Sequence, residues 1–234
     1  MIRSLLLVGL VACAAGSAFA QEAPPDTTLP PETEPIDVKV LRTVYNVDVV
    51  PFELTMRGVN ASAYPIYFGV SPALWAGTLL TESSTRPALR MTLAQGVNFG
   101  TTYALKNIVQ RPRPYAALDD IAARDRGHQG DDVFDPHSFP SGHTSSAFVI
   151  ATSLSLSYQE WYVTVPAYTW ATLMGLTRAW HGVHYPSDIV VGAGIGTASA
   201  FATHLLLPLV LASGDDGPDL GADAGVPITI VIPL

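Results

Sequence analysis

Charged residues are almost absent from the second half of this chain, and their absence limits what the chain can fold into. Only Glu160, Arg178 and Asp188 carry charge between Pro136 and Ser213. The full sequence of 234 residues is 48% hydrophobic and 14% charged, whereas about a quarter of the residues in an ordinary soluble domain are charged. The composition therefore predicts one domain of apolar helices, either embedded in a membrane or packed as an unusually apolar bundle.

Five long segments with few charges are expected to be helices: residues 64–81, 87–106, 144–158, 161–177 and 189–213. The last of them reaches the length of about 20 apolar residues that a membrane-spanning helix needs. Their many small residues suit close packing in lipid or in a soluble bundle, so both settings stay open and membrane association is favoured. Residues 38–54 and 226–234 alternate in the manner of strands. The expected fold class is all-α, a bundle of about five to six helices to which a small terminal β-pair could be added.

The N-terminus resembles an export signal. Residues 1–20 contain one basic residue, an apolar stretch and a small-x-small site that ends at Ala20. Two alternatives are a retained transmembrane helix and lipoprotein processing at Cys13, the only cysteine of the chain. Residues 21–37 are rich in proline and acid and are expected to form a disordered linker. Residues 38–234 would then form the functional domain.

The first polar cluster is Pro140-Ser141-Gly142-His143. Proline favours the first turn of a helix, and glycine lets a ligand approach the backbone closely. The helix that follows offers free N–H groups and the positive end of its dipole to an anion. The Ser141 hydroxyl and the Gly142 N–H are therefore expected to hold phosphate oxygens, although an ordinary helix start could have the same sequence.

A second cluster contains Arg178, His184 and Asp188. Because the last two are four residues apart, a carboxylate can lie beside an imidazole. An aspartate that accepts the Nδ1 proton fixes the tautomer and leaves Nε2 as a nucleophile. Arg178 stands alone in apolar sequence, and a buried charge needs a partner, which an oxyanion would supply. The alternative is a capping aspartate beside a structural histidine.

The third cluster is basic. Lys106 lies near the end of an expected helix, which the sequence Arg111-Pro112-Arg113-Pro114 then terminates. These cations can neutralise two or three phosphate oxygens, arginine through paired contacts and lysine as a point charge. Taken alone, the cluster would be an ordinary basic helix end.

Together, the three clusters resemble the type 2 phosphatidic acid phosphatase superfamily, which also contains vanadium haloperoxidases and bacterial acid phosphatases. The family pattern K-x6-R-P, P-S-G-H and S-R-x5-H-x3-D is similar to KNIVQRPRP, FPSGHTSS and TRAWHGVHYPSD in this chain. The resemblance covers residues 87–212. Thr177 stands where the family usually has serine and retains the hydroxyl. The family spacing selects Arg113 as the motif arginine and leaves Arg111 as a supporting charge or salt-bridge partner.

The resemblance implies a role for each matching residue. His184 would be the nucleophile that becomes phosphohistidine, Asp188 would orient it, and His143 would act as general acid. The implied phosphate-binding residues are Lys106, Arg113, Ser141, Gly142 and Arg178. Neither a metal nor a cofactor is implied, because the cationic side chains take that place. His181 lies nearby, but its spacing from the motif arginine is wrong for the nucleophile.

The expected activity is hydrolysis of a phosphate ester or diphosphate, and the apolar helices favour a lipid-linked substrate. The alternatives are a soluble periplasmic acid phosphatase of broad specificity and, less favoured, a vanadate-dependent haloperoxidase, whose chains are usually much longer. The net charge of −8 argues against a nucleic-acid partner. An export signal places the protein in the periplasm or the cell-envelope membrane, with the active site on the periplasmic side. The sequence identifies neither the substrate nor the oligomeric state.

Overall fold

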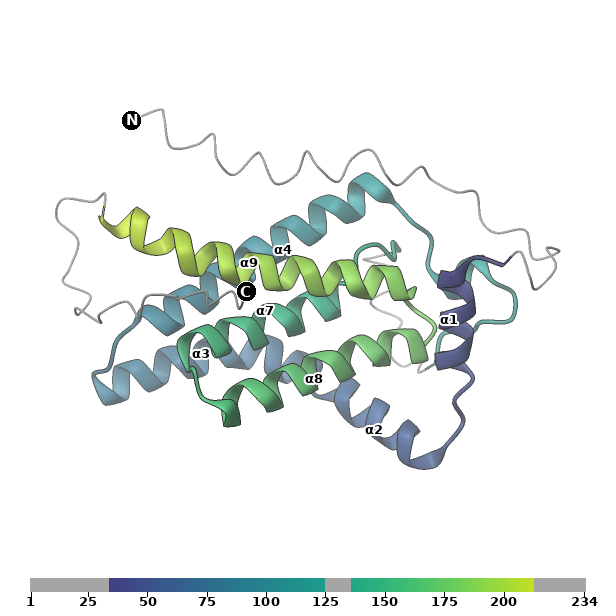
Figure 1. Cartoon of the computed structure of the whole chain (residues 1–234), viewed down its shortest axis with the longest axis horizontal. Coiled ribbons are helices and arrows are strands. Elements are labelled where there is room, and N and C mark those ends of the chain that lie inside the picture. The colour runs from purple at the N-terminus through teal and green to yellow at the C-terminus, as the bar shows by residue number, and fades with distance from the viewer. Residues whose placement is uncertain (1–33, 125–135, 213–234) are drawn as a thin grey trace, which may run out of the picture.

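The computed structural model describes residues 34–124 and 136–212, which form a bundle of helices along one long axis (Figure 1). Its helices are α1 (Ile36–Tyr45), α2 (Val50–Ala61), α3 (Ala63–Thr81), α4 (Arg86–Val109), α5 (Pro114–Ala117), α7 (Gly142–Ser157), α8 (Trp161–Trp180) and α9 (Pro186–Ala212). No strand is formed within these two ranges. The predicted all-α class is confirmed, with eight helices in the described part where five or six were expected.

The core is built around α7, which packs against α4, α8 and α9. The buried side chains of α7 are all small or β-branched, and Ala147, Val149 and Ala151 are fully buried. Met174 of α8 and Met91 of α4 fill the spaces beside them. Since small side chains allow helix axes to approach closely, the apolar sequence produces a tight bundle.

Two glycines bring α9 against the start of α7. A Cβ atom added at Gly196 would lie 2.2 Å from the carbonyl oxygen of Ser145, and one added at Gly192 would lie 2.6 Å from that of Ser141. Both distances are too short for a real Cβ atom, so only glycine fits at these two positions without moving the helices. The first turn of α7 is therefore held against the second and third turns of α9, and the motif residues of both helices lie close to this contact.

The strand expectation for residues 38–54 is wrong, because α1 and α2 occupy them. Val38 and Leu41 are buried one helical turn apart, so the apolar positions follow the helical period even though the valines suggested alternation. Pro51 lies in the first turn of α2, where its missing N–H is tolerated. Helix α1 begins at Ile36, two residues before the expected start of the domain. The expected signal sequence, most of the linker and the C-terminal strand lie outside the described residues.

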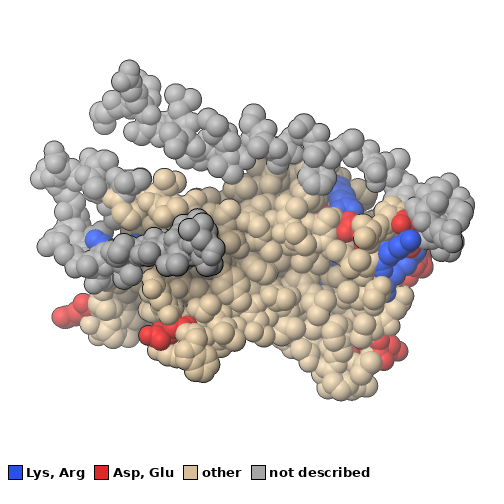
Figure 2. All heavy atoms as spheres, in the orientation of Figure 1, with Lys and Arg blue, Asp and Glu red and all other residues tan. Residues whose placement is uncertain are grey.

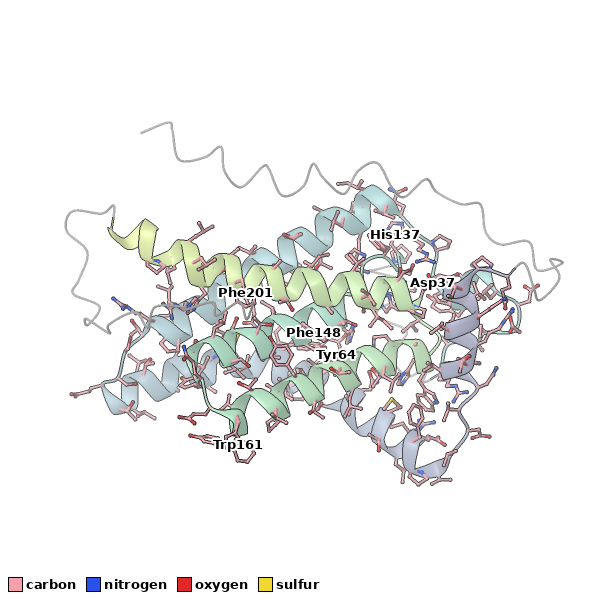
Figure 3. All side chains as sticks on the ribbon, viewed as in Figure 1. Asp37, Tyr64, His137, Phe148, Trp161 and Phe201 are labelled. Atoms are coloured by element: carbon pink, nitrogen blue, oxygen red, sulfur yellow. The ribbon has the colours of Figure 1, made fainter. Side chains whose placement is uncertain are left out.

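The bundle places the three motifs at one end. Helices α4 and α8 finish there, and α7 and α9 begin there (Figure 1). Asp37 and His137 mark this end in Figure 3, and Trp161 lies toward the other. All five long helices predicted from the sequence are present, and each end lies within three residues of its expected position. The prediction that the motifs meet at one end of the bundle is confirmed.

Candidate active site

His184 and Asp188 form a buried pair at the start of α9. His184 lies in the loop between α8 and α9 and is 2% exposed, and Asp188 is fully buried. Nδ1 of the imidazole is 3.6 Å from Oδ2 of Asp188. The Tyr185 N–H donates a 2.8 Å hydrogen bond to the same carboxylate oxygen, as expected for an acid in the first turn of a helix. Among the described residues Nδ1 has no hydrogen-bond partner, so the pair is adjacent but not tightly bonded.

The opposite edge of the same ring faces a cation. Nη1 of Arg113 lies 3.5 Å from Nε2 of His184 and donates to the carbonyl oxygen of Val183 at 3.4 Å. These distances are at the long limit of hydrogen bonding. An oxyanion at this edge would contact the guanidinium and the ring together. Arg113, the arginine that the motif spacing selected, is the one beside Nε2.

The segment before α7 ties that helix to the pair. The Ser141 N–H donates to the carbonyl oxygen of Asp188 at 3.0 Å, and the buried Ser141 hydroxyl caps α7 by accepting from the Thr144 N–H at 3.4 Å. A Cβ atom added at Gly142 would lie 3.9 Å from Cε of Lys106. The first residue of α7 is therefore beside the lysine of the first motif, as expected for a shared anion site.

The remaining two cations are held by neighbouring polar groups. Nζ of Lys106 donates to the carbonyl oxygen of His137 at 2.7 Å. Nε of Arg178 donates to the Thr177 hydroxyl at 2.9 Å, and its Nη2 donates to the side-chain oxygen of Asn60 in α2. The threonine that replaces the usual serine thus keeps a hydroxyl that supports the arginine.

The charges of all three motifs act on one imidazole. Burial lowers the pKa of His184 well below its ordinary value of about 6.5. Three cations lower this pKa further, in the order Arg113, Lys106 and Arg178. His184 is therefore neutral near pH 7, and the lone pair of a neutral ring is what a nucleophile requires.

His143, the second residue of α7, completes the group from the side of α3. Its ring meets the edges of Tyr64 and Tyr67, with centroids 5.6 and 5.7 Å away. The Tyr67 hydroxyl donates to the backbone oxygen of His143 at 2.7 Å. Burial lowers the pKa of His143 well below its ordinary value, and the positive charge of Arg178 lowers it further. Every residue predicted for the site therefore lies at this end of the bundle.

A comparison with protein families now identifies the chain. The sequence profile of the PAP2 superfamily matches residues 87–210, more than half of the chain, from α4 to α9. The chain belongs to the PAP2 superfamily. The resemblance drawn from the three motifs is confirmed.

The curated relatives of this PAP2 protein match it over short stretches. A lipid A 1-phosphatase of Porphyromonas gingivalis is 41% identical over 63 residues, covering 26% of this chain and 14% of that protein. A lipid A 4'-phosphatase of Bacteroides thetaiotaomicron is 30% identical over 95 residues, covering 40% and 42%. The bacitracin transport permease protein BcrC of Bacillus licheniformis is 39% identical over 66 residues, covering 27% and 30%. The matches thus span less than half of each relative's length.

Two solved structures share the fold of this PAP2 protein. LpxE of Aquifex aeolicus has a TM-score of 0.61 at 24% identity, covering 76% of this chain and 99% of that one. A PAP2-type phosphatidylglycerolphosphate phosphatase of Bacillus subtilis has a TM-score of 0.58 at 22% identity, covering 74% and 85%. At these identities the similarity shows the fold alone.

Several residues around the PAP2 motifs were not singled out by the sequence. Asp37 of α1 and Asn60 of α2 reach the site from outside the matched region, and no motif or spacing pointed to them.

Arg111 pairs with Asp188 and Asp37 at 2.8 Å each, which confirms its expected role as a salt-bridge partner. His181 instead contacts the carbonyl oxygen of Thr177 through Nδ1 at 2.6 Å. Within residues 34–124 and 136–212, no three His, Cys, Asp or Glu side chains are grouped to hold a metal ion.

Proposed function

We propose that this protein is a phosphatase that hydrolyses a phosphate ester or diphosphate carried by a lipid, through a phosphohistidine intermediate. The observation that carries the proposal is the convergence of three cations on the neutral, buried imidazole of His184. Phosphoryl transfer needs a positioned nucleophile and fixed positive charge around the transferring oxygens. Family membership supports the same chemistry.

In the proposed first step, Nε2 of His184 attacks phosphorus as the bond from phosphorus to the ester oxygen breaks. Nε2 is the ring atom beside Arg113, so the phosphoryl oxygens would lie between the nucleophile and the guanidinium. Asp188, next to Nδ1, stabilises the positive charge that the ring acquires. His143 donates a proton to the leaving oxygen.

In the second step, water attacks the phosphohistidine. His143, deprotonated by the first step, accepts a proton from this water, the bond between nitrogen and phosphorus breaks, and inorganic phosphate leaves. Lys106 and Arg178 act in both steps by stabilising negative charge on the phosphoryl oxygens. The second step frees His184 of the phosphoryl group and returns the proton to His143, so the catalytic cycle needs no co-reactant besides water.

A lipid-linked substrate is supported by the surface of the bundle and by the relatives. Helix α9 contains the one described segment, Pro186–Pro208, that is long and apolar enough to cross a membrane. Large apolar side chains are also exposed on α3 and α4, such as Phe68 and Phe99. Two of the relatives described above are lipid A phosphatases. We infer that the protein resides in the cell envelope, with the site at the periplasmic surface, where a headgroup could reach it.

The proposal is tested by phosphate release from lipid A phosphates, phosphatidylglycerol phosphate and a soluble aryl phosphate, with and without detergent. We expect His184→Gln to lose at least about 10³-fold in kcat and to form no acid-labile phosphoprotein. His204→Gln is the matched control, since His204 lies about 24 Å along α9 from Asp188 and is not part of the site. Equal release by the His184 variant and the wild type would refute the mechanism. Release of phosphate from the aryl ester alone would favour the soluble acid phosphatase, and halide oxidation that requires added vanadate would favour the haloperoxidase.

A further inference from the structure

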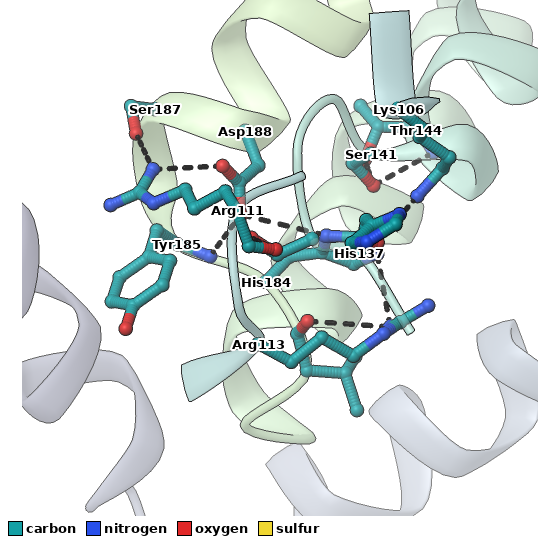
Figure 4. A network of polar contacts seen from close by, with 12 residues as sticks. Lys106, Arg111, Arg113, His137, Ser141, Thr144, His184, Tyr185, Ser187 and Asp188 are labelled. Atoms are coloured by element: carbon teal, nitrogen blue, oxygen red, sulfur yellow. Dashed lines mark hydrogen bonds and ion pairs between the residues drawn. The ribbon is translucent and has the colours of Figure 1, made fainter. Parts of the chain in front are cut away.

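Helix α1 contributes a carboxylate, Asp37, to the network of polar contacts behind the proposed nucleophile. Figure 4 shows the part of this network that Arg111, Ser187 and Asp188 form. Oδ2 of Asp37 accepts from Nη2 of Arg111 at 2.8 Å and from the Ser187 hydroxyl at 2.6 Å. Its Oδ1 accepts from the Ser187 N–H at 2.9 Å. Asp37 therefore binds the motif-flanking arginine and the first turn of α9 at once.

Arg111 links Asp37 to Asp188. Its Nη1 donates to Oδ1 of Asp188 at 2.8 Å and to the Ser187 hydroxyl at 2.7 Å. The guanidinium also lies over the ring of Tyr185, 3.8 Å from its centroid. A planar guanidinium held by two carboxylates and an aromatic face has little freedom to rotate. Its orientation then fixes the plane of the Asp188 carboxylate.

The Asp188 carboxylate depends on such support. It is fully buried, and an ionised carboxylate without a partner would be strongly destabilised there. Arg111 holds one of its oxygens and the Tyr185 N–H holds the other. Only a carboxylate fixed in this plane keeps Oδ2 turned toward Nδ1 of His184, which is already 3.6 Å away.

We propose that Asp37 and Arg111 are positioning residues for the reaction, acting through Asp188 on His184. The proposal rests on the proposed function. Asp37 lies outside the region that matches the family profile, so α1 would supply part of the site from beyond the three motifs.

Removal of the Asp37 charge should leave α1 docked. Val38 and Leu41 of α1 pack in a buried cluster with Leu118 and Ala179. A second ion pair, Arg42 with Asp120, also ties α1 to the loop after α5, with hydrogen bonds of 2.8 Å to both carboxylate oxygens. Since this pair does not touch Asp188, it provides a control that alters the docking of α1 without altering the site.

The test compares Asp37→Asn with Asp120→Asn, in the wild type and in an Arg111→Gln background, by steady-state kinetics. We expect Asp37→Asn to lower kcat about tenfold, which is ~1.4 kcal/mol, with KM changed less than about twofold. Asp120→Asn should keep the wild-type kcat even if it lowers the melting temperature as much as Asp37→Asn does. Because Asp37 acts through Arg111, Asp37→Asn should have no further effect on kcat in the Arg111→Gln background.

A second readout does not need turnover. The ring nitrogen NMR signals of His184 report its tautomer and hydrogen bonding, and we expect them to move in Asp37→Asn but not in Asp120→Asn. Unchanged ring signals with an unchanged kcat in Asp37→Asn, or multiplicative effects of Asp37→Asn and Arg111→Gln on kcat, would overturn the positioning role. A wild-type protein that releases no phosphate would refute the proposed function, and the ring signals would still decide whether Asp37 orients the imidazole.

Discussion

A buried imidazole among cations stays neutral because protonation would add another positive charge where water cannot screen it. His184 is in this position, with Arg113 against Nε2. The cations proposed to bind phosphate thereby keep the lone pair of the nucleophile free before the substrate arrives. A phosphate dianion would offset these charges and favour the protonated form of His143, the form that a general acid requires.

The neutral state of His184 makes stability depend on pH. Because its folded pKa lies below the unfolded value of about 6.5, the unfolded chain binds more protons in mild acid. The free energy of unfolding should therefore fall below about pH 6.5, by up to about 1.4 kcal/mol for each pH unit, until the folded pKa is reached. Thermal unfolding of the wild type and of His184→Gln, measured from about pH 7.5 to about pH 5.5, tests this. We expect the wild-type melting temperature to fall more steeply, and parallel curves would contradict the prediction.

A substitution at Gly142 should affect substrate binding without lowering the stability of the fold. An added methyl group would meet Cγ2 of Thr102 at 3.8 Å and Cε of Lys106 at 3.9 Å, both ordinary contacts. Alanine also has less conformational freedom than glycine in the unfolded chain, which stabilises the fold by about 0.4–1 kcal/mol at a compatible position. We expect Gly142→Ala to keep or raise the melting temperature while kcat/KM falls about tenfold, because the methyl occupies space where an oxyanion would approach the backbone. An unchanged kcat/KM would show that this N–H does not bind the substrate.

The residues of the site were predictable to different degrees. His184 and Asp188 have a spacing whose chemical meaning is local, so the sequence alone paired them. Asp37 and Asn60 have no such spacing, since they meet Arg111 and Arg178 only after α1 and α2 have folded against the bundle. Contacts of this kind depend on tertiary packing, so they cannot be predicted from a single sequence.

At the scale of the elements, the long helices were predictable and the short ones were not. Long apolar stretches with as few charges as α3 or α9 leave few alternatives to a helix. Helix α1 has only ten residues, and its valines are favourable in strands. What decides its conformation is the burial of Val38 and Leu41 on one face. That burial exists only once the partner surfaces are in place.

The contact between α7 and α9 gives a prediction at the same scale. A methyl group at Gly196 would lie 2.2 Å from the Ser145 carbonyl oxygen, whereas one at Gly194 would meet nothing within 4 Å. We expect Gly196→Ala to lower the free energy of unfolding by about 3 kcal/mol or more, because two helix backbones must separate. Gly194→Ala, the matched control, should be neutral or stabilising by up to about 1 kcal/mol. Thermal unfolding of both variants tests the prediction, which equal melting temperatures would contradict.

At the scale of the whole molecule, charge and apolar surface are separated. On the face shown in Figure 2, charged side chains lie near the two ends of the bundle and the surface between them is uncharged. Exposed apolar side chains occur on six helices of the described part, for example Leu80, Tyr103, Trp161 and Leu205. Such extensive apolar exposure is unusual for a soluble monomer. A bilayer around the middle of the bundle would cover it and leave the site near one membrane surface.

A lysine in α9 distinguishes a lipid-facing surface from a water-facing one. Ala198 is exposed and lies near the middle of Pro186–Pro208. In water, Ala198→Lys should change stability by no more than about 0.5 kcal/mol, whereas a lysine at the centre of a spanning helix costs about 2.5–3.5 kcal/mol. We therefore expect Ala198→Lys to reduce the protein recovered in carbonate-washed membranes, while Val40→Lys, at an exposed site of α1, leaves it unchanged. Equal recovery of both variants, with wild-type protein released by osmotic shock, would place the bundle in water and leave its apolar surface to another partner.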